Sequence, residues 1–340
     1  MKRGVIAGAG YFARFHADAW PRVDGAKIVA VSDPDGEKAR AFAREFGIPK
    51  VYTDTAGMLM VEKPDFLDVV TGPATHRALV ELAAANGVDV ICQKPMAPEW
   101  DDCVAMVRRC EARGVRLLIH ENWRWQPWYR EVRRLAEGGL LGRIFHVGFR
   151  MRTGDGRGER PYEVQPYFRE MGRLLIYETL VHFLDTFRFL AGELESVSCR
   201  MARVNPLIRG EDCALIEVDF ASGAQGLIDA NRISGPAPAP VAFGELRVEG
   251  DRGMVRMTPE GRLWLTEYGE AEREHQYERA EEGYKGDSVW AFQQHATDCL
   301  RGGVQCESEG SEYLKTVAAV LACYRSAETD GRVRIGEVLS

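Results

Sequence analysis

A glycine-rich loop near the start of the chain has the spacing of a phosphate-binding turn. Gly8–Ala13 reads G-x-G-x-x-A and directly follows the apolar run Val5–Ala7. In such a loop Gly8 allows a tight turn, Gly10 lets the backbone approach a pyrophosphate, and a small last residue keeps the helix close to the strand. The pattern therefore predicts a dinucleotide whose phosphates lie at a helix N-terminus, where free N–H groups favour anions.

An acid at the end of the next predicted strand supports this interpretation. Lys27–Asp33 reads as a strand that ends in Asp33, 23 residues after Gly10. An acid about 20 residues beyond the loop binds the adenosine ribose hydroxyls. Its carboxylate would repel a 2′-phosphate, so we expect NAD rather than NADP. The alternative is an ordinary glycine turn between a strand and a helix.

Lys94 is a candidate for stabilising negative charge. It lies in Gln93-Lys94-Pro95, directly after the apolar strand predicted over Val88–Cys92. In doubly wound sheets, ligands bind at the carboxyl ends of the strands. A fixed cation there would stabilise the charge that develops on a substrate oxygen. The alternative is a solvated lysine in a turn.

Glu178 and His182 lie four residues apart within the strongly apolar segment Leu174–Asp185. Residues at this spacing share one face of an α-helix. An imidazole, which titrates near pH 6.5 when unperturbed, suits a general base near neutrality. Ionisable groups in so apolar a helix must be paired or face a cavity. A structural Glu–His pair is therefore the alternative to a catalytic one.

Composition limits the function classes. The chain has 340 residues, 45% apolar and 28% charged, with a net charge of −7. This length favours two domains, and the interspersed negative charge argues against nucleic acid or an acidic membrane as partner. The eight cysteines form no C-x-x-C pair, so we expect free thiols in a reducing cytoplasm and no metal site. We expect neither a signal peptide nor a membrane span.

Residues 1–121 predict an α/β domain with a parallel, doubly wound sheet, because strands alternate with helices. The strands expected after Asp33 are Val51–Tyr52, Phe66–Thr71, Val88–Cys92 and Val115–His120. The helices expected are Phe12–Val23, Asp35–Phe46, Thr55–Val61, one capped by Thr75 and running to about Asn86, and Trp100–Arg113.

Residues 122–340 predict an α+β domain with an open, mostly antiparallel sheet. The expected strands are Ile144–Thr153, Ser196–Val204, Ala214–Phe220, Ala224–Ile233, Phe243–Glu249, Met254–Thr258 and Leu263–Glu267. The expected helices run to about Glu137, over Met171–Leu190, and over about Ser288–Arg301 and Glu309–Thr329. Since helices cover one face of such a sheet, a second subunit is expected on the other, as a homodimer or homotetramer.

Several motifs together resemble the glucose–fructose oxidoreductase/inositol dehydrogenase (Gfo/Idh/MocA) family over essentially the whole chain. Besides the nucleotide loop, Thr71–His76 resembles the family's T-x-P-x-x-H stretch and Gln93–Pro95 its E-K-P motif, with Gln for Glu. Asn122–Pro127 resembles N-x-R-x-x-P, and Glu178–Asp185 resembles D-x-G-x-H-x-x-D, with Glu for Asp and Leu for Gly.

The resemblance implies an NAD(P)-dependent oxidation or reduction of a sugar or polyol, with a Rossmann domain and oligomers built on the C-terminal sheet. The cofactor-binding candidates are Gly8, Gly10, Tyr11, Phe12, Asp33, Thr71, Pro73, His76, Gln93, Lys94 and Asn122. The catalytic candidates are Lys94, His182 and Glu178, and the substrate-binding candidates are Arg124, Trp125, Tyr167, Arg152, Glu178 and His182.

In the expected mechanism, His182 accepts the hydroxyl proton, Lys94 stabilises the forming alkoxide and Glu178 orients His182 or the substrate. His120–Tyr129 and the Glu178 segment look most like aldose dehydrogenases such as those acting on D-apiose, which implies a lactone product. The enzymatic alternative is an inositol dehydrogenase. Because Gln93 and Glu178 depart from the family pattern, a catalytically silent NAD-binding sensor subunit is the third reading.

Overall fold

The computed structural model describes residues 1–339 and divides into two compact units. The first unit consists of Met1–Trp125 and Ala280–Leu314, and the second of Gln126–Arg279 and the chain from Lys315 onward. The sequence predicts one boundary, between residues 121 and 122. The structure differs, since Ala280–Leu314 returns to the first unit.

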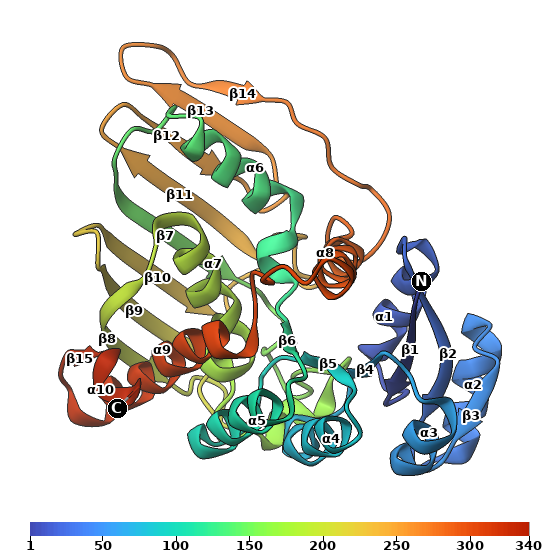
Figure 1. The fold of residues 1–340 in the computed structure, drawn as a ribbon. Helices are drawn as coiled ribbons and strands as arrows, with labels where there is room; N and C mark the ends of the chain where they lie inside the picture. Colours follow the sequence, from blue (N-terminus) through green and yellow to red (C-terminus); the bar gives the residue numbers. More distant parts are fainter. Residues whose placement is uncertain (340) are drawn as a thin grey trace. The chain divides into compact units, whose positions relative to one another are not determined.

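A six-stranded parallel sheet forms the centre of the first unit (Figure 1). Its strands are β1 (Lys2–Ala7), β2 (Ala26–Ser32), β3 (Lys50–Tyr52), β4 (Phe66–Val69), β5 (Asp89–Gln93) and β6 (Leu117–His120). Their spatial order is β3-β2-β1-β4-β5-β6. This is the doubly wound Rossmann order, which reverses between β1 and β4, and ligands of such sheets bind at the carboxyl ends beside the reversal.

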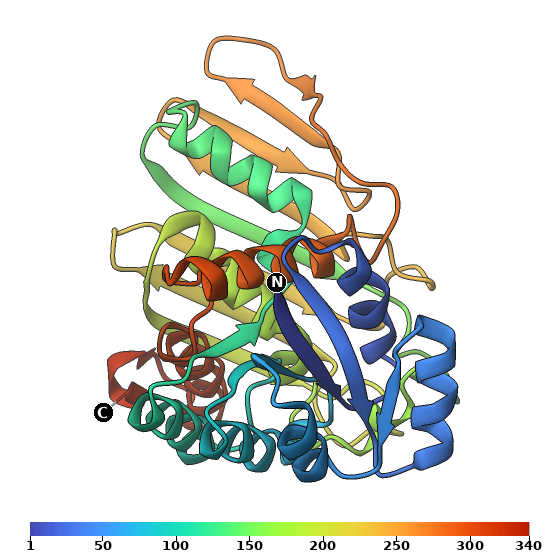
Figure 2. The same cartoon turned by 45° about the vertical axis from the view of Figure 1, so that its right-hand side comes forward.

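Helices connect these strands as predicted, with short differences at their ends. They are α1 (Ala13–Ala19) with the short turn η1 (Trp20–Arg22), α2 (Gly36–Phe46), α3 (Thr55–Glu62), α4 (Pro73–Ala85) and α5 (Trp100–Arg113). Helices α4 and α5 lie side by side (Figure 2). The prediction that Thr75 caps α4 was wrong: the helix begins at Pro73 after Gly72, because proline suits the first helical position, where an N–H would have no partner.

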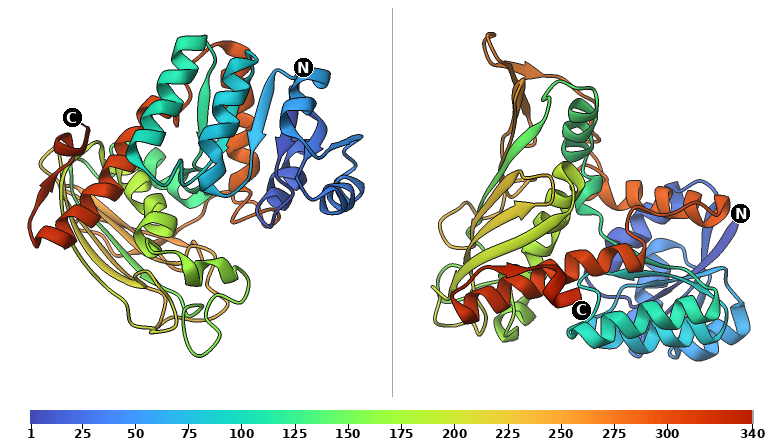
Figure 3. Two further views of the ribbon diagram at one scale, coloured as in Figure 1. Left: turned by 90° about the horizontal axis from the view of Figure 1, so that it is seen from below. Right: turned by 60° about the vertical axis from the view of Figure 1, so that its left-hand side comes forward.

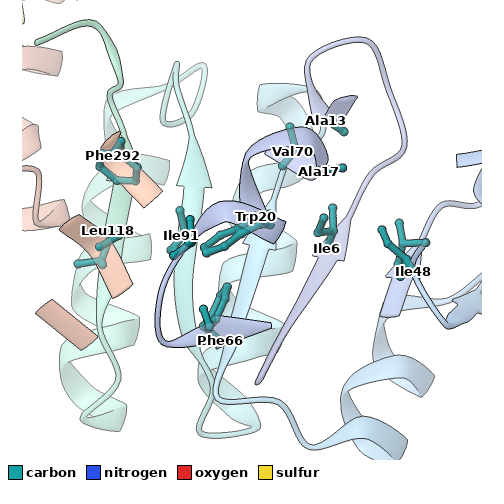
Figure 4. Close-up of a cluster of buried hydrophobic side chains, with 14 of the residues drawn as sticks. Ile6, Ala13, Ala17, Trp20, Ile48, Phe66, Val70, Ile91, Leu118 and Phe292 are labelled. Carbon is teal, nitrogen blue, oxygen red and sulfur yellow. The ribbon is translucent and has the colours of Figure 1, made fainter. Parts of the chain in front are cut away.

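Helix α8 (Ser288–Gly302) explains why Ala280–Leu314 belongs to the first unit. Its Phe292 joins the same buried cluster as Leu118 of β6 and Ile91 of β5 (Figure 4). Ala296 and Cys299 continue this apolar stripe at helical spacing. An amphipathic helix must bury such a stripe. Here the stripe packs against the parallel sheet at its edge strand β6.

The second unit contains a nine-stranded sheet in the order β14-β13-β12-β11-β7-β10-β9-β8-β15. Its strands are β7 (Ile144–Arg152), β8 (Leu194–Ala202), β9 (Cys213–Phe220), β10 (Gln225–Asn231), β11 (Gly244–Gly250), β12 (Gly253–Met257), β13 (Leu263–Glu267), β14 (Arg273–His275) and β15 (Val333–Arg334). Only β7 and β10 pair in parallel, so the mostly antiparallel prediction is confirmed. Strands β14 and β15 were not predicted, because so few residues show no alternation.

Three helices lie on one face of this sheet, α6 (Pro127–Glu137), α7 (Val181–Ala191) and the second-unit part of α9 (Gly310–Thr329) (Figure 3, right). The short elements η3 (Pro166–Glu170), η4 (Leu175–Leu180) and α10 (Gly336–Leu339) complete the unit. Apolar side chains such as Leu215 and Leu227 are 42% and 36% exposed on the other face. Among residues 1–339, no helix is long and apolar enough to cross a membrane.

Candidate functional site

Gly8 follows β1 in a conformation that requires glycine. Its φ is +104°, and a Cβ would lie 2.3 Å from the carbonyl oxygen of Val70, so any other residue would be strained and would clash. At Gly10, by contrast, a Cβ would meet no protein atom within 4 Å. The protein therefore leaves open the space over Gly10 that a pyrophosphate needs.

Tyr11 and Phe12 complete the loop. Tyr11 is exposed, whereas Phe12 is half-buried and precedes α1. As the N-cap residue, Phe12 gives the helix no side-chain hydrogen bond. The first N–H groups of α1 thus receive no acceptor from their N-cap side chain, which suits a helix end that faces phosphates.

Asp33 lies directly after β2 and holds the glycine loop. Its carboxylate accepts hydrogen bonds from the N–H groups of Ala9 (2.9 Å) and Asp35 (3.0 Å) and lies 3.2 Å from Nζ of Lys38. Burial opposes ionisation of Asp33, but these three donors outweigh it and lower its pKa. The protein therefore offers a charged acceptor at the edge where the ribose hydroxyls of NAD are expected.

The buried side of the segment after β4 contacts His76. This histidine is fully buried, and its ring nitrogens lie 3.1 Å from the carbonyl oxygens of Thr71 and Met96. Burial lowers its pKa, although both carbonyls oppose the shift. A neutral His76 has one N–H and can donate to only one of these carbonyls, but its ring fills the space between the loops after β4 and β5. It would therefore act on a cofactor by positioning. Above it, the hydroxyls of Thr71 and Thr75 lie 2.7 Å apart, beside Pro73.

Lys94 begins the loop after β5, and the side chain before it fixes its backbone. Oε1 of Gln93 accepts the N–H of Lys94 at 2.9 Å. Nε2 of Gln93 lies 2.9 Å from Nε2 of His16 and 3.3 Å from Nδ1 of His120. No sequence pattern links these histidines to Lys94, because they come from α1 and β6 and only the fold brings them together.

The predicted segment Asn122–Trp125 packs onto the returning chain of the first unit. Nδ2 of Asn122 donates to the hydroxyl of Ser288 at 2.8 Å. Arg124, in the short turn η2 (Trp123–Trp125), is 7% exposed and donates to the carbonyl of Glu307 at 3.4 Å. The ring of Trp125 packs at a tilt against His295, with centroids 4.5 Å apart. The proposed contacts of these residues with cofactor or substrate stay predictions.

In the second unit, Glu178 lies in a π-helical turn, η4, that precedes α7. The prediction of one continuous helix over Met171–Leu190 was therefore wrong at its start. The four-residue spacing from Glu178 to His182 crosses the junction between π- and α-helix, so an α-helical face does not describe it. π-helical turns are rare in proteins overall, and those that occur often lie at functional sites.

Arg232 is a charged neighbour of Glu178 that no sequence motif indicates. Its side chain is buried, donates to both carboxylate oxygens of Asp155 and lies 3.8 Å from the Glu178 carboxylate. Its third nitrogen donates to Thr179 Oγ1 at 3.1 Å, and that hydroxyl donates to Glu178 at 2.7 Å. Burial opposes the charge on Arg232, but Asp155 outweighs it and raises its pKa.

The position of Arg232 follows from the pairing of β7 with β10. These parallel strands end together, since Arg152 pairs with Asn231. Asp155 and Arg232 follow the two strand ends and meet there. The rings of Tyr162 and Phe168 lie 4.9 and 5.0 Å from the guanidinium. A short polar strand end such as Asn231-Arg232 gave no sign of burial in the sequence.

His182 lies in the first turn of α7 and is 6% exposed. Asp185, three residues on, is fully buried and accepts a hydrogen bond from Thr316 at 3.0 Å. Asp185 therefore anchors α7 to α9 within the second unit.

Two weaker substrate candidates have other partners. Arg152 uses its guanidinium on Asp229, donating to the backbone carbonyl at 2.8 Å and to the carboxylate at 2.5 Å. Tyr167 is 57% exposed, and Gln165 donates to its hydroxyl at 2.7 Å. Arg152 is thus held within the sheet, and Tyr167 is the better placed of the two to meet a ligand.

A group of possible metal ligands lies in the first unit, outside the predicted site. His295, Cys299 and Cys306 have ligand atoms within 4.8 Å of one another. The backbone N–H of Glu307, however, already donates to Nε2 of His295 at 3.1 Å, so that lone pair is in use. The eight cysteines are free thiols.

Comparison with known families matches both units. Residues 2–121 match the oxidoreductase family with an NAD-binding Rossmann fold, and residues 129–256 match the Gfo/Idh/MocA C-terminal domain. The chain belongs to the Gfo/Idh/MocA family. It is an NAD-dependent oxidoreductase, as the glycine loop and Asp33 predicted.

Relatives within the Gfo/Idh/MocA family include two kinds of dehydrogenase. D-apiose dehydrogenase from Rhizobium rhizogenes is 35% identical over 99% of this chain and 98% of its own length. scyllo-Inositol 2-dehydrogenase (NAD(+)) from Bacillus subtilis is 32% identical over 68% of each chain. The first similarity extends over both units and the second over only part of the chain.

A solved Gfo/Idh/MocA structure agrees with these relatives. An oxidoreductase from Agrobacterium radiobacter, in complex with NAD+, L-tartaric acid and magnesium, superimposes with a TM-score of 0.92. It is 35% identical and covers 99% of both chains. The WlbA dehydrogenase from Bordetella pertussis, in complex with NADH and UDP-GlcNAcA, has a TM-score of 0.81 at 25% identity and 98% coverage.

Proposed function

We propose that this chain oxidises an aldose with NAD, with D-apiose as the first candidate and a lactone as product. The observation that carries the proposal is the 35% identity to D-apiose dehydrogenase over 99% of the chain. The intact Lys94 and His182 support a catalytic rather than a silent protein. When bound, NAD supplies the hydride acceptor.

The residues of the chain then supply binding, charge and proton transfer. Gly8 and Gly10 would accommodate the pyrophosphate and Asp33 the adenosine ribose. Lys94, in the first unit, would stabilise the alkoxide that forms as the substrate hydroxyl loses its proton. His182, in the second unit, would accept that proton at a ring nitrogen.

Glu178 would orient a substrate hydroxyl as a charged hydrogen-bond acceptor. Arg232 and Thr179 support this role, because they hold one of its carboxylate oxygens (3.8 and 2.7 Å). A carboxylate keeps further lone pairs for a ligand. Glu178 therefore fits the position of the family's shorter Asp as a substrate-binding acid.

The test is NADH formation with D-apiose, other aldoses and inositols, with NADP assayed in parallel. We expect turnover on an aldose and a preference for NAD. His182→Ala should lower kcat by about 100-fold or more, the scale of a lost general base, and leave the Kd for NAD nearly unchanged. Turnover on inositols alone would move the reaction to a ring carbinol, and NAD binding without turnover on any substrate would favour the sensor.

We also propose a cytoplasmic homodimer or homotetramer. Free thiols throughout the chain suit a reducing compartment. The helix-free face of the second-unit sheet, with exposed Leu215 and Leu227, supports self-association through that face. Light scattering of the purified chain tests the assembly, and Leu227→Glu should dissociate it if this face is used.

A further inference from the structure

A buried amide joins two histidines to the backbone of Lys94 in the first unit. Gln93 is 4% exposed, and His16 and His120 are fully buried. Gln93 stands where the E-K-P pattern has an acid. The hydrogen bonds of the Gln93 amide show how glutamine differs from glutamate at this position.

The orientation of the amide follows from its partner at Lys94. A backbone N–H can only donate, so the atom 2.9 Å from it must be the carbonyl Oε1. The NH2 group therefore faces the two rings, with Nε2 at 2.9 Å from His16 and 3.3 Å from His120. Two N–H bonds of one amide thus meet two ring nitrogens.

This orientation fixes both tautomers. Nε2 of His16 and Nδ1 of His120 must each present a lone pair to Gln93, so each ring carries its single proton on the other nitrogen. For His16 that proton lies on Nδ1, 2.9 Å from the carboxylate of Asp68. Trp20 donates to the same carboxylate oxygen at 2.7 Å. Both histidines are therefore neutral.

The surroundings favour neutral rings as well. The two imidazoles lie against each other at a tilt, with centroids 4.0 Å apart, and the ring of Phe292 from α8 lies 4.3 Å from that of His120. Two like charges at this separation in a buried place would be costly. The other titratable groups next to the cluster are Asp68 from β4 and the Cys92 thiol from β5, and Lys94 follows Gln93 in the chain. Burial raises the pKa of the Cys92 thiol.

We propose that Gln93 is a positioning residue, whose amide holds His16 and His120 as neutral rings and thereby fixes the backbone of Lys94. An acid could not do this, because an ionised carboxylate only accepts hydrogen bonds. It would need a proton on the facing nitrogen of each ring. His16 already directs its Nδ1 proton at Asp68, so a second proton on Nε2 would make it a buried imidazolium. This inference rests on the proposed catalytic role of Lys94.

The proposal predicts the effect of restoring the acid. In Gln93→Glu, a facing imidazole must be protonated for the network to close. As the pH rises and that proton leaves, the carboxylate meets ring lone pairs and the Lys94 loop loses its fixed position. We expect kcat/KM of this variant to fall on the alkaline side, by about tenfold per pH unit above the ionisation, where the wild type shows no such fall.

The test measures kcat/KM for wild type, Gln93→Glu and Gln93→Met between roughly pH 5.5 and 9, where imidazoles titrate. Gln93→Met keeps the length but makes no hydrogen bond, so it should lower kcat at every pH without the alkaline fall. A Gln93→Glu profile parallel to that of the wild type would refute the proposal.

A second readout does not depend on activity. Ring ¹⁵N NMR of the wild type, assigned with His16→Asn and His120→Asn, should show neutral Nδ1–H and Nε2–H tautomers respectively over this range. In Gln93→Glu one of the two should appear as an imidazolium. An imidazolium in the wild type would overturn the proposal even if no substrate were turned over, whereas absent turnover with the expected tautomers would fault only the proposed function.

Discussion

At the residue scale, the two units stabilise their buried polar residues in opposite ways. In the first unit an uncharged amide, Gln93, serves two neutral rings. In the second, Arg232 keeps its charge because the Asp155 carboxylate takes two of its donors. A fixed positive charge thus lies 3.8 Å from the Glu178 carboxylate, whereas uncharged groups support the backbone of Lys94.

Arg232 allows a direct test of this arrangement. Arg232→Lys keeps the positive charge but loses the planar fork that bonds Asp155 and Thr179 at once. We expect a loss of about 1.5–3 kcal/mol in the free energy of unfolding, the scale of a hydrogen bond to a charged group. The KM for the sugar should rise while the Kd for NAD stays constant, as measured by urea unfolding and initial rates.

A matched control is Arg256→Lys. Arg256 also pairs with an acid of the second unit, Glu272, at 2.8 Å, but its side chain is one-third exposed and far along the sheet, on β12. It should change stability by less than about 1 kcal/mol, since exposed pairs contribute little. Equal effects of the two substitutions on KM would mean that Arg232 does not act on the substrate through Glu178.

At the element scale, the π turn η4 is held at its beginning by one acid. Glu211 is 6% exposed, and its carboxylate accepts the N–H groups of Leu174 and Ile176 and the hydroxyl of Tyr324. Burial and this carboxylate both raise the pKa of Tyr324, so the phenol stays protonated and donates. The entry to the segment of Glu178 and His182 therefore depends on a residue from the turn before β9.

Glu211→Gln tests this anchor. The substitution keeps the size of the side chain but turns NH2 toward backbone N–H donors, which leaves buried groups unpaired. We expect a loss of about 1–3 kcal/mol in the free energy of unfolding and a lower kcat. Thermal unfolding against the exposed control Glu245→Gln measures it; a Tm equal to that of the control would show that the carboxylate does not stabilise the turn.

Most elements were predictable from the sequence, and the failures have physical causes. The Rossmann strands, α5 and β13 follow from apolar periodicity and glycine ends. The π turn could not be predicted, because its first N–H groups bond Glu211, which lies far from it in sequence. Gly8 and Asp33 were identifiable because their roles are local, whereas Arg232, His16 and His120 gain theirs only through strand pairing and packing.

At the scale of the whole molecule, we expect one half-buried lysine to make stability depend on pH. Lys285 lies with Nζ 5.5 Å from the ring of Trp123 and 5.9 Å from that of Tyr284. Burial lowers its pKa to about 7. In the unfolded chain a lysine titrates near 10.4, so between these values the unfolded state binds the extra proton.

The free energy of unfolding should therefore rise with pH through this window. In Lys285→Met the rise should be absent, and at pH 7 and below the variant should be more stable than the wild type by on the order of 2 kcal/mol, allowing for partial solvent screening. Urea unfolding of both proteins at roughly pH 6, 8 and 10 measures the difference. If the difference does not change with pH, Lys285 is charged in the folded protein.

The return of Ala280–Leu314 to the first unit has a consequence for synthesis on the ribosome. The parallel sheet emerges early, but α8, which supplies Phe292 against Leu118, emerges only after nearly all of the second unit. At translation rates of about 5–20 residues per second, many seconds pass between synthesis of the sheet and synthesis of α8. During that time the apolar side chains that α8 covers, such as Leu118, lack this partner. The second unit can fold during that interval, so the cofactor-binding half begins to be made before the second unit and is completed after it.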